Sequence, residues 1–354
     1  NRRERSMRHR YSRALITGVG GQDGAFLAAQ LLGEGVVVCG THRPSSPRGN
    51  WRLAELGIDQ HPRLQLHALD TGDAAACREL VAAFAPQAIF HLAGQSRVAD
   101  SFRDPVGSLH ANGVGTVNLL EAMRRAAPNA HFVLASSAEI FGSPAQVPQD
   151  ENTLLRPDSP YGLSKLVAHA AMHSWRASFG LAASSAILFN HESELRDAAF
   201  VTRKITRAAA RIRLGLDSEV ALGNLDAQRD FGYAPEYVSA MATMAEAEKG
   251  DDFILATGAA ASIREFASAA FAAAGMPLEW QGQGIDEMAV ERGNGKPRIR
   301  IDPLLLRPVD APLLVGNAAK ARQRLGFAPR IDMAELARRM LEADMARERQ
   351  GQPV

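Results

Sequence analysis

Thr17–Gly24 reads TGVGGQDG and follows a short apolar run at once, before a helical pattern begins. Gly18 permits a tight turn, Gly21 lets the backbone approach a pyrophosphate, and Gly24 lets a helix pack closely on a strand. The amino end of that helix would face the phosphate charge. A plain structural turn can carry similar glycines, but the strand–turn–helix context favours dinucleotide binding. No Gly-Lys-Ser/Thr sequence follows, so the motif is not a P-loop.

Outward from this motif, short apolar runs alternate with helical patterns. Strands are expected at 14–17, 36–39, 88–92, 131–135 and 186–189, and helices near 23–32, 74–84, 105–126 and 161–179. Short apolar runs between helices are typical of a parallel sheet that is buried on both faces. The pattern therefore predicts an α/β fold with a Rossmann-type, doubly wound parallel sheet.

Beyond residue 190 the pattern becomes looser. Helices are expected near 201–214, 234–247, 263–274, 318–325 and 333–345, with a strand near 253–255, and the polar, glycine-rich stretch 281–296 predicts a mobile loop. We expect a disordered basic tail over 1–12 and a dinucleotide-binding Rossmann domain over 13–190 plus about 232–257. A smaller, interleaved α/β cap that binds substrate should cover about 191–231 plus 258–348.

Composition restricts the classes of function. The chain has 354 residues and a net charge of +1, so no overall field attracts nucleic acid or an anionic membrane. Arginines crowd the first 13 residues; a nucleic-acid arm is one interpretation and a disordered tail the simpler one. The two cysteines, Cys39 and Cys77, argue against a disulfide framework and fit a cytoplasmic location. No apolar stretch approaches the roughly 20 residues that span a membrane, and no metal site is expected.

The end of the second strand indicates which dinucleotide binds. Enzymes that use NAD usually place Asp or Glu there to hold the ribose hydroxyls, whereas this chain has Arg43 followed by Pro44 and Ser45-Ser46. Arg43 with Ser46 suits a 2′-phosphate and so indicates NADP, although an exposed loop arginine would look the same. Asp70, at the end of a further strand expected between the second strand and the helix near 74–84, is placed either to accept from the adenine amine or to start a turn.

Two further motifs carry chemistry. In YGLSK, Tyr161 and Lys165 are four residues apart and share a helix face. An ammonium beside a phenol lowers the pKa of the phenol, so Tyr161 can act as base on a sugar hydroxyl while hydride leaves to nicotinamide. Ser137 and Glu139 leave the carboxyl end of the strand at 131–135, where ligands of open α/β sheets bind. Ser137 could bond the sugar oxygen that becomes a ketone, and Glu139 could take a proton from the next carbon; a solvated loop glutamate is the alternative.

Together these motifs resemble the extended short-chain dehydrogenase/reductase superfamily. Longer stretches resemble the GDP-mannose 4,6-dehydratase family in particular, from about Arg13 to Ala346. The most discriminating are ILFNHES and FVTRKI; the full set is Ile16–Gly24, Trp51–Ile58, Ser159–Lys165, Ile187–Ser193, Phe200–Ile205, Gly223–Asp230 and Ala256–Gly258.

The resemblance implies an NADP-dependent hydro-lyase that converts GDP-mannose to GDP-4-keto-6-deoxymannose, and a homodimer or homotetramer. It implies that Tyr161 is the base with Lys165 as its partner. Ser137 stands where the family usually has threonine, and Glu139 would take the C5 proton and release the C6 hydroxyl. The implied cofactor-binding residues are Gly18, Gly21, Gln22, Asp23, Gly24, Arg43, Ser46, Asp70, Leu92, Ala93, Gln95, Tyr161, Lys165, Leu188, His191 and Arg196. The implied substrate-binding residues are Ser96, Asn190, Lys204, Arg229, Arg307 and Asp310.

Several positions depart from the family pattern. Ala138 replaces a serine, and Pro44 replaces a second arginine, a role that Arg48 could take. The stretch Glu194–Asp197 keeps Arg196 but adds two carboxylates, and Asp310 stands for a glutamate. A GDP-4-keto-6-deoxymannose reductase, or the same dehydration of a GDP-heptose, remains an alternative. A non-catalytic NADP sensor would need neither the Tyr/Lys pair nor the glutamate.

Overall fold

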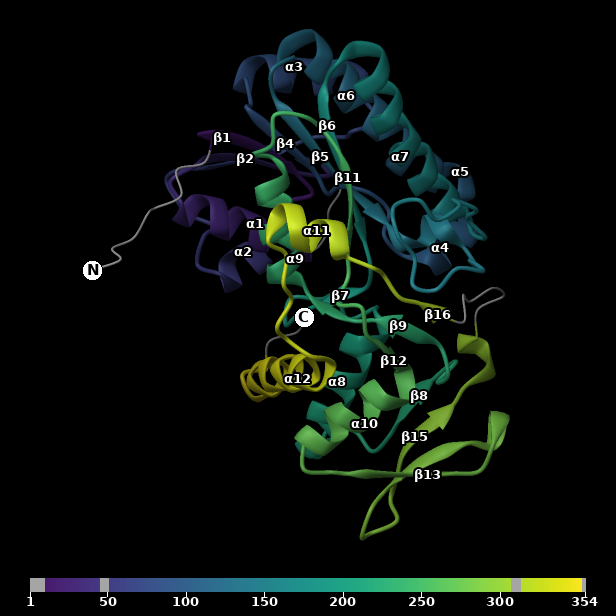
Figure 1. Cartoon of the computed structure of the whole chain (residues 1–354). Coiled ribbons are helices and arrows are strands. Elements are labelled where there is room, and N and C mark those ends of the chain that lie inside the picture. Colours follow the sequence, from purple (N-terminus) through teal and green to yellow (C-terminus); the bar gives the residue numbers. More distant parts are fainter. Residues whose placement is uncertain (1–9, 45–50, 307–312, 352–354) are drawn as a thin grey trace, which may run out of the picture. The chain divides into compact units, whose positions relative to one another are not determined.

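The computed structural model describes residues 10–44, 51–306 and 313–351 (Figure 1). The chain divides into two compact units. The first comprises residues 1–188, 234–255 and 317–328, and the second comprises residues 189–233, 256–316 and 329–354. Residues 317–328, which the sequence pattern assigns to the cap, thus cluster with the first unit.

The first unit is built on one seven-stranded sheet. Its strands stand in the order β11-β6-β5-β4-β1-β2-β3, and every neighbouring pair is parallel. Because the strand order reverses between β1 and β4, the chain leaves these two strands in opposite directions, and ligands of open α/β sheets bind at the carboxyl ends of such a pair. This confirms the predicted doubly wound parallel sheet. The strands are β1 Arg13–Thr17, β2 Val37–His42, β3 Leu64–Ala68, β4 Ala88–His91, β5 His131–Ser137, β6 Ala182–Leu188 and β11 Asp252–Leu255.

Helices cover both faces of this sheet (Figure 1). On one face, side chains of α3, α6 and α7 share a core with apolar side chains of β1, β4 and β5. The helices α1, α9 and α11 also pack against strands of this sheet: α1 against β1 and β2, α9 against β6, and α11 against β11. The helices are α1 Gln22–Gly33, α2 Trp51–Glu55, α3 Ala74–Phe84, α4 Val98–Arg103, α5 Pro105–Leu109, α6 Gly115–Ala126, α7 Pro160–Phe179, α9 Ala234–Met244 and α11 Ala319–Leu325. The single helix expected over 105–126 is interrupted by a π-helical turn, η1 His110–Val114.

The amino-terminal segment corrects one expectation. Tyr11 is buried and lies edge-on to Phe90, with ring centroids 6.1 Å apart. The Ser12 amide donates to Oε1 of Gln87 at 2.7 Å. Residues 10–12 are therefore held in the first unit rather than in a tail, because an aromatic side chain there finds an apolar partner. The rest of the expected tail, residues 1–9, lies outside the described residues.

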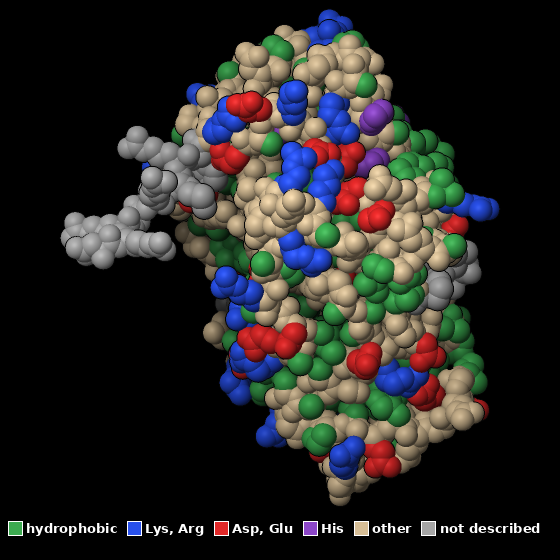
Figure 2. Space-filling model, viewed as in Figure 1, with side chains coloured by type: hydrophobic (Ala, Val, Ile, Leu, Met, Phe, Trp, Pro, Cys, Tyr) green, Lys and Arg blue, Asp and Glu red, His purple; other side chains and the backbone are tan. Residues whose placement is uncertain are grey.

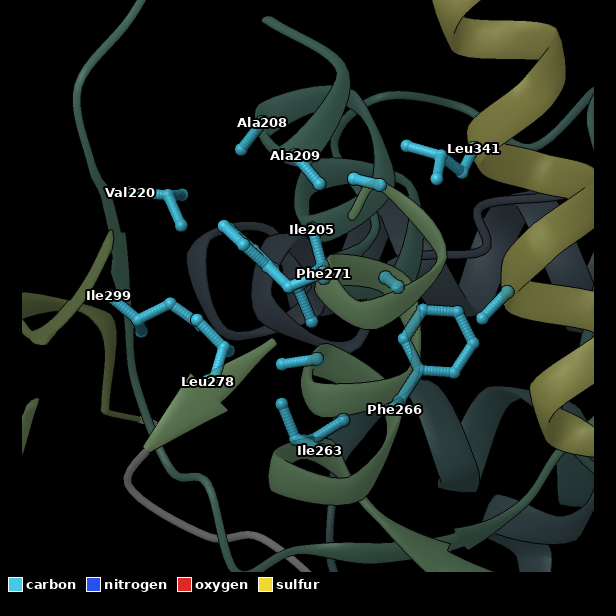
Figure 3. Close-up of a cluster of buried hydrophobic side chains, with 14 of the residues drawn as sticks. Ile205, Ala208, Ala209, Val220, Ile263, Phe266, Phe271, Leu278, Ile299 and Leu341 are labelled. Carbon is cyan, nitrogen blue, oxygen red and sulfur yellow. The ribbon is translucent and has the colours of Figure 1, made fainter. Parts of the chain in front are cut away.

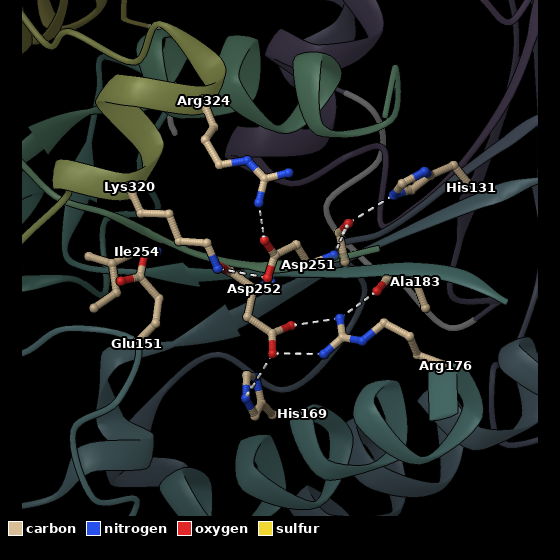
Figure 4. Close-up of polar contacts among 11 residues, drawn as sticks. His131, Glu151, His169, Arg176, Ala183, Asp251, Asp252, Ile254, Lys320 and Arg324 are labelled. Atoms are coloured by element: carbon tan, nitrogen blue, oxygen red, sulfur yellow. Dashed lines mark hydrogen bonds and ion pairs between the residues drawn. The ribbon is translucent and has the colours of Figure 1, made fainter. Parts of the chain in front are cut away.

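Two adjacent carboxylates, Asp251 just before the edge strand β11 and Asp252 at its start, explain why residues 317–328 join this unit (Figure 4). Asp251 accepts from Nζ of Lys320 at 2.7 Å and from Nη1 of Arg324 at 2.6 Å, and both cations belong to α11. Asp252 accepts from Nη2 of Arg176 on α7 at 2.9 Å. The edge strand is thus tied to a helix on each side, and sequence periodicity gives no sign of such charge pairing.

The second unit contains three small sheets and three helices among its described residues. The sheets have the orders β13-β14-β15-β8, β12-β9-β16 and β10-β7. Phe266 and Phe271 of α10, Ile205 of α8 and Leu341 of α12 meet in one buried cluster (Figure 3). The elements are β7 His191–Glu192, α8 Val201–Arg213, β8 Val220–Leu222, β9 Gln228–Asp230, β10 Gly232–Tyr233, β12 Ala260–Ser262, α10 Ile263–Ala273, β13 Leu278–Gln281, η3 Gly284–Asp286, β14 Met288–Glu291, β15 Pro297–Ile301, η4 Pro303–Leu305, β16 Leu313–Leu314 and α12 Met333–Arg349.

The loop expected over 281–296 is wrong in part. The whole of β14 lies inside that stretch and pairs with both β13 and β15. Ala289 and Val290 are buried in a stretch that is otherwise mostly polar. Two small apolar positions are enough to fix a strand here because the neighbouring strands supply its hydrogen bonds.

Along the described chain, no helix has both the length and the apolar character to cross a membrane. On the face shown in Figure 2, basic and acidic side chains are interspersed.

A buried histidine gives the first unit a dependence on pH. One ring nitrogen of His131, Nδ1, lies 3.0 Å from the carbonyl oxygen of Ala247, and the other lies 2.8 Å from Oγ of Ser184. Burial lowers the pKa of His131 from 6.5 to about 4, against the opposing effects of the Ala247 carbonyl and Glu246. The folded state therefore holds the ring neutral at a pH at which the unfolded chain would protonate it.

We predict that the free energy of unfolding falls as the pH drops from 6.5 to about 4, since the unfolded state binds the extra proton in that window. His131→Gln should flatten this slope, whereas His173→Gln, at an exposed position, should not. Urea unfolding at several pH values measures both slopes. An unchanged slope in His131→Gln would show that this ring does not contribute.

Candidate active site

The glycine-rich turn between β1 and α1 has no room for side chains at two positions. Gly18 has a φ of +75°, and a Cβ there would stand 2.8 Å from the amide nitrogen of Ala93. At Gly24 a Cβ would stand 2.3 Å from the carbonyl oxygen of Gly18. The Gly21 amide donates to that same oxygen at 2.9 Å. The turn therefore brings the amino end of α1 against the segment after β4, at the carboxyl edge of the sheet, as a phosphate-binding turn requires.

Arg52, which is not among the predicted site residues, supports this turn. Its Nη1 donates to the carbonyl oxygen of Gly20 at 2.9 Å, and its guanidinium lies 4.5 Å from the ring centre of Trp51. The guanidinium is mostly buried. Sequence alone could not find it, because the pattern of a short helix does not show which group a polar side chain on it meets. Arg43 is exposed just after β2, and Ser46, like Arg48, lies outside the described residues.

The expected cofactor-binding residues of the first unit lie near the carboxyl ends of its strands. Asp70 follows β3 and accepts from the Gly72 amide at 2.9 Å, so it does start a turn. The amides of Leu92 and Ala93 each lie 3.2 Å from an oxygen of Thr17, the carbonyl oxygen and Oγ1 respectively. Of the other candidates, Gln22 and Asp23 are joined side chain to side chain in the first turn of α1, Ser96 is exposed, and Leu188 ends β6.

Asn112, in the π-helical turn, links the segment after β4 to α7. Its Oδ1 accepts from the Gln95 amide at 3.0 Å, and its Nδ2 donates to the Gln95 carbonyl at 3.1 Å and to Oγ of Ser164 at 2.8 Å. Ser164 in turn donates to the carbonyl oxygen of Tyr161 at 2.7 Å. The sequence offered one unused signal, a helix-disfavouring Asn inside an apolar helix. Its position in an irregular turn is typical of functional sites.

Tyr161 and Lys165 lie in the first turns of α7, as expected. The Tyr161 amide donates to Oγ of the buried Ser101 at 3.0 Å, which fixes the start of the helix. Nζ of Lys165 donates to the carbonyl oxygen of Ala135 at 2.9 Å and lies 5.9 Å from the ring centre of Tyr161. Burial lowers the pKa of Lys165 to about 8, although Asp23 opposes this shift. The ammonium is thus held beside the phenol at the end of β5.

Ser137 and Glu139 form the turn that follows β5. Oγ of Ser137 accepts from the Glu139 amide at 3.2 Å and caps the short 3-10 helix η2 Ala138–Phe141. A Cβ at Gly162 would stand 2.5 Å from the carbonyl oxygen of Glu139, so α7 touches the backbone of this turn. The structure thereby brings the four expected catalytic residues to adjoining segments. The substituted position Ala138 is buried.

In the second unit the expected residues occupy three segments. The carbonyl oxygen of Asn190 accepts from the Gly232 amide at 2.8 Å, and Nδ1 of His191 lies 2.7 Å from the Phe189 carbonyl oxygen. Lys204 is partly buried on α8, and burial lowers its pKa. Arg229 is buried in β9, the central strand of its sheet. Arg307 and Asp310 lie outside the described residues.

The two added carboxylates near Arg196 both have partners. Oε1 of Glu194 accepts from the Tyr233 hydroxyl at 3.2 Å, and Oδ1 of Asp197 accepts from the Ala199 amide at 2.9 Å. Asp197 is thus satisfied locally, whereas the second carboxylate oxygen of Glu194, Oε2, is buried without a hydrogen-bond partner among the described residues.

Known proteins resemble this chain over nearly its whole length. Residues 15–340 match the family model described as GDP-mannose 4,6 dehydratase. A GDP-mannose 4,6-dehydratase of Sinorhizobium fredii (strain HH103) is 42% identical over 338 residues, which cover 94% of this chain and 96% of the relative. The GDP-mannose 4,6 dehydratase of Homo sapiens is 38% identical, with 94% and 91% covered. The solved structure of RMD from Pseudomonas aeruginosa complexed with NADPH is 25% identical, with a TM-score of 0.73 and 95% and 100% covered. The chain belongs to the GDP-mannose 4,6-dehydratase family.

Proposed function

We propose that this protein is an NADP-dependent hydro-lyase that converts GDP-mannose to GDP-4-keto-6-deoxymannose. The observation that carries the proposal is the contact of the Glu139 turn with the helix that bears Tyr161 and Lys165, beside a dinucleotide-binding turn. Membership of the family supports the same reaction. A base and a second acid–base group on adjoining segments fit a reaction with two separate proton transfers.

The residues of the first unit fit NADP. Where Gly18 and Gly24 lie, a Cβ would collide with backbone, so the turn can admit a pyrophosphate closely. Arg43 stands after β2 in place of an acidic residue, which favours a ribose that carries a 2′-phosphate. When bound, NADP supplies a hydride acceptor at C4 of the sugar and a hydride donor at C6.

We assign Tyr161 as the base for the C4 hydroxyl. The ammonium of Lys165 favours the phenolate form by its charge, and the Ala135 carbonyl holds that ammonium in place. Oγ of Ser137 accepts from the Glu139 amide, which leaves its own proton to be donated to the C4 oxygen of the sugar. That bond would stabilise the oxygen as it becomes a carbonyl.

Glu139 would act after C4 is oxidised. A ketone at C4 acidifies C5, so the carboxylate can take the C5 proton and pass it to the C6 hydroxyl, which leaves as water. The Ser137 cap fixes the backbone of this glutamate. Tyr161 or solvent then returns a proton to C5.

For the second unit we propose that Asn190, Lys204 and Arg229 hold the GDP portion, together with Arg307 and Asp310. Cations held within the protein make strong charge-assisted bonds to a diphosphate, and both Lys204 and Arg229 are at least partly buried. Ser96 would contact the sugar, and Leu188, His191 and Arg196 the cofactor.

We further propose that the protein forms a homodimer or a homotetramer. Large apolar side chains are exposed on α4, α5 and α7. Leu109 and Val167 lie side by side, because a Cβ added at Gly113 on η1 would contact both side chains. Such contiguous apolar surface marks an interaction site. The exposed residues of this face are Phe102, Val106, Leu109, Val114, Leu163 and Val167. A cytoplasmic location is proposed because Cys39 and Cys77 are both free, buried thiols.

The reaction scheme predicts different blocks in two variants. Glu139→Gln should still reduce bound NADP with GDP-mannose but release little product, because only the elimination needs the carboxylate. Tyr161→Phe should prevent even the reduction. Absorbance in the NADPH band during a single turnover separates the two. Near-normal turnover of Glu139→Gln would exclude this glutamate from the mechanism.

The same scheme predicts where the hydrogen from C4 goes. With GDP-mannose deuterated at C4 and catalytic NADP, the product should be lighter by one water and carry deuterium at C6. NADPH should not be consumed over many turnovers. Stoichiometric consumption of NADPH with a 4-keto sugar, and no reaction with GDP-mannose, would instead identify a reductase.

Gly162 should set the spacing of the two proton-transfer groups. Gly162→Ala adds a Cβ 2.5 Å from the Glu139 carbonyl oxygen, so α7 or the turn has to shift. A displacement of about 1 Å can cost on the order of 100-fold in rate. We expect kcat to fall with little change in NADP affinity. Gly180→Ala, in a helix cap with open space around it, is the control for added backbone strain.

The proposed association predicts that Leu163→Asp or Val106→Asp shifts the protein to smaller assemblies in analytical ultracentrifugation. A charge at a buried apolar contact is strongly unfavourable. Leu154→Asp, at an exposed position on a loop, should leave the association state unchanged. A wild type that sediments as a monomer would refute the proposal.

A further inference from the structure

The motif FVTRKI contains an arginine to which neither the reaction nor substrate binding assigns a role. Arg203 is 1% exposed, and its residue has the largest volume among the fully buried residues that the structure describes. Its Nε donates to Oδ1 of Asp344 on α12 at 2.5 Å. Oγ1 of Thr206 donates to the other oxygen of that carboxylate at 2.7 Å. Burying an ion pair is costly and is weak evidence for a gain in stability alone, so another use for the pair has to be sought.

The other edge of the guanidinium faces a loop. Nη1 of Arg203 donates to the carbonyl oxygen of Arg196 at 2.7 Å and to that of Glu194 at 3.3 Å. The loop is also folded tightly on itself, because Leu195 and Arg196 donate their amides to Oγ and the carbonyl oxygen of Ser193 at 3.1 and 3.0 Å. One guanidinium therefore joins α12 to the backbone that carries Arg196.

The side chain of Arg196 is fixed as well. Its Nε lies 2.9 Å from Oε2 of the buried Glu192, at ion-pair distance, and its guanidinium carbon lies 3.6 Å from the ring centre of Phe200. Oε2 of Glu192 also accepts from the Thr202 hydroxyl at 2.6 Å. Backbone and side chain of Arg196 are thus both held in one arrangement, as expected for a residue that must meet a ligand already positioned.

We propose that Arg203 is a positioning residue for cofactor binding, which holds the 194–196 loop so that Arg196 meets NADP. This rests on the proposed cofactor contact of Arg196. On the same helix the next residue, Lys204, is assigned to GDP. Helix α8 would then serve the cofactor through one residue and the nucleotide sugar through the next.

Arginine is required for this task on geometric grounds. Its planar fork donates along several directions at once, so one side chain reaches the Asp344 carboxylate and two carbonyl oxygens. A lysine in its place keeps the charge but has a single nitrogen. It can satisfy the carboxylate or the loop, and the loop is released if the buried carboxylate takes the ammonium.

The test compares Arg203→Lys with a variant that disturbs the same carboxylate but not the loop. Thr206→Val removes a hydrogen bond to Asp344 and leaves the bonds from Arg203 to the carbonyl oxygens intact. Titration of the full-length protein with NADPH and with GDP gives both dissociation constants, and thermal unfolding gives Tm. Arg203→Lys should weaken NADPH binding about tenfold, the equivalent of one charge-assisted hydrogen bond. Its GDP affinity should change little, and Thr206→Val should lower Tm without changing NADPH affinity.

Three outcomes would overturn the inference. Unchanged NADPH affinity in Arg203→Lys is the first. The second is a loss of NADPH affinity in both Arg203→Lys and Thr206→Val that is proportional to their loss of Tm, since this would be a purely structural effect. The third uses Arg196→Leu: if it binds NADPH normally, the proposed contact of Arg196 fails, and the role of Arg203 fails with it. If Arg196→Leu binds weakly and Arg203→Lys does not, the inference alone fails. Asp344→Asn, which keeps an acceptor for Arg203, replaces Arg203→Lys if that variant does not fold, and should give a smaller loss of NADPH affinity.

Discussion

A buried ammonium at the carboxyl edge of the sheet is the constraint on which the site of the first unit depends. Lys165 can remain there only if hydrogen bonds replace the water it loses. The Ala135 carbonyl supplies one such bond, which joins α7 to the end of β5. Burial still lowers the pKa of Lys165 to about 8. The positive charge of Lys165 can therefore favour the phenolate form of Tyr161, although burial makes the charged form of the lysine itself less stable than in water.

That constraint extends to the segments around α7. The helix has to approach the sheet closely, so Gly162 has no room for a side chain against the Glu139 carbonyl. Gly94 is similarly limited, because a Cβ there would stand 2.3 Å from Oδ1 of Asn112. Asn112 can then bond the Gln95 backbone and Ser164 together. A base, a carboxylate and a dinucleotide turn come together because glycines and one asparagine allow their backbones to touch.

Sequence reasoning found the parts of this arrangement that depend on local pattern. The glycine motif, the strands and the Tyr161/Lys165 spacing follow from periodicity and helix geometry, and the family resemblance is confirmed by relatives that match over most of the chain. Sequence reasoning did not find Asn112 or Arg52. The partners of a polar side chain on a helix depend on the segments that pack around it, and periodicity does not show these. The strand β14 was missed for a similar reason, since its buried positions are small and its stability comes from the strands on each side.

The second unit shows how substitutions near a ligand-binding loop can be absorbed. Two carboxylates beside Arg196 would compete for its guanidinium if they faced it without partners. Glu194 instead accepts from the Tyr233 hydroxyl, and Asp197 accepts from a backbone amide two residues on. The carboxylate that does reach Arg196 is the buried Glu192. The added charge therefore leaves the pairing of Glu192 with Arg196 intact, because Arg203 holds the carbonyl groups of the loop.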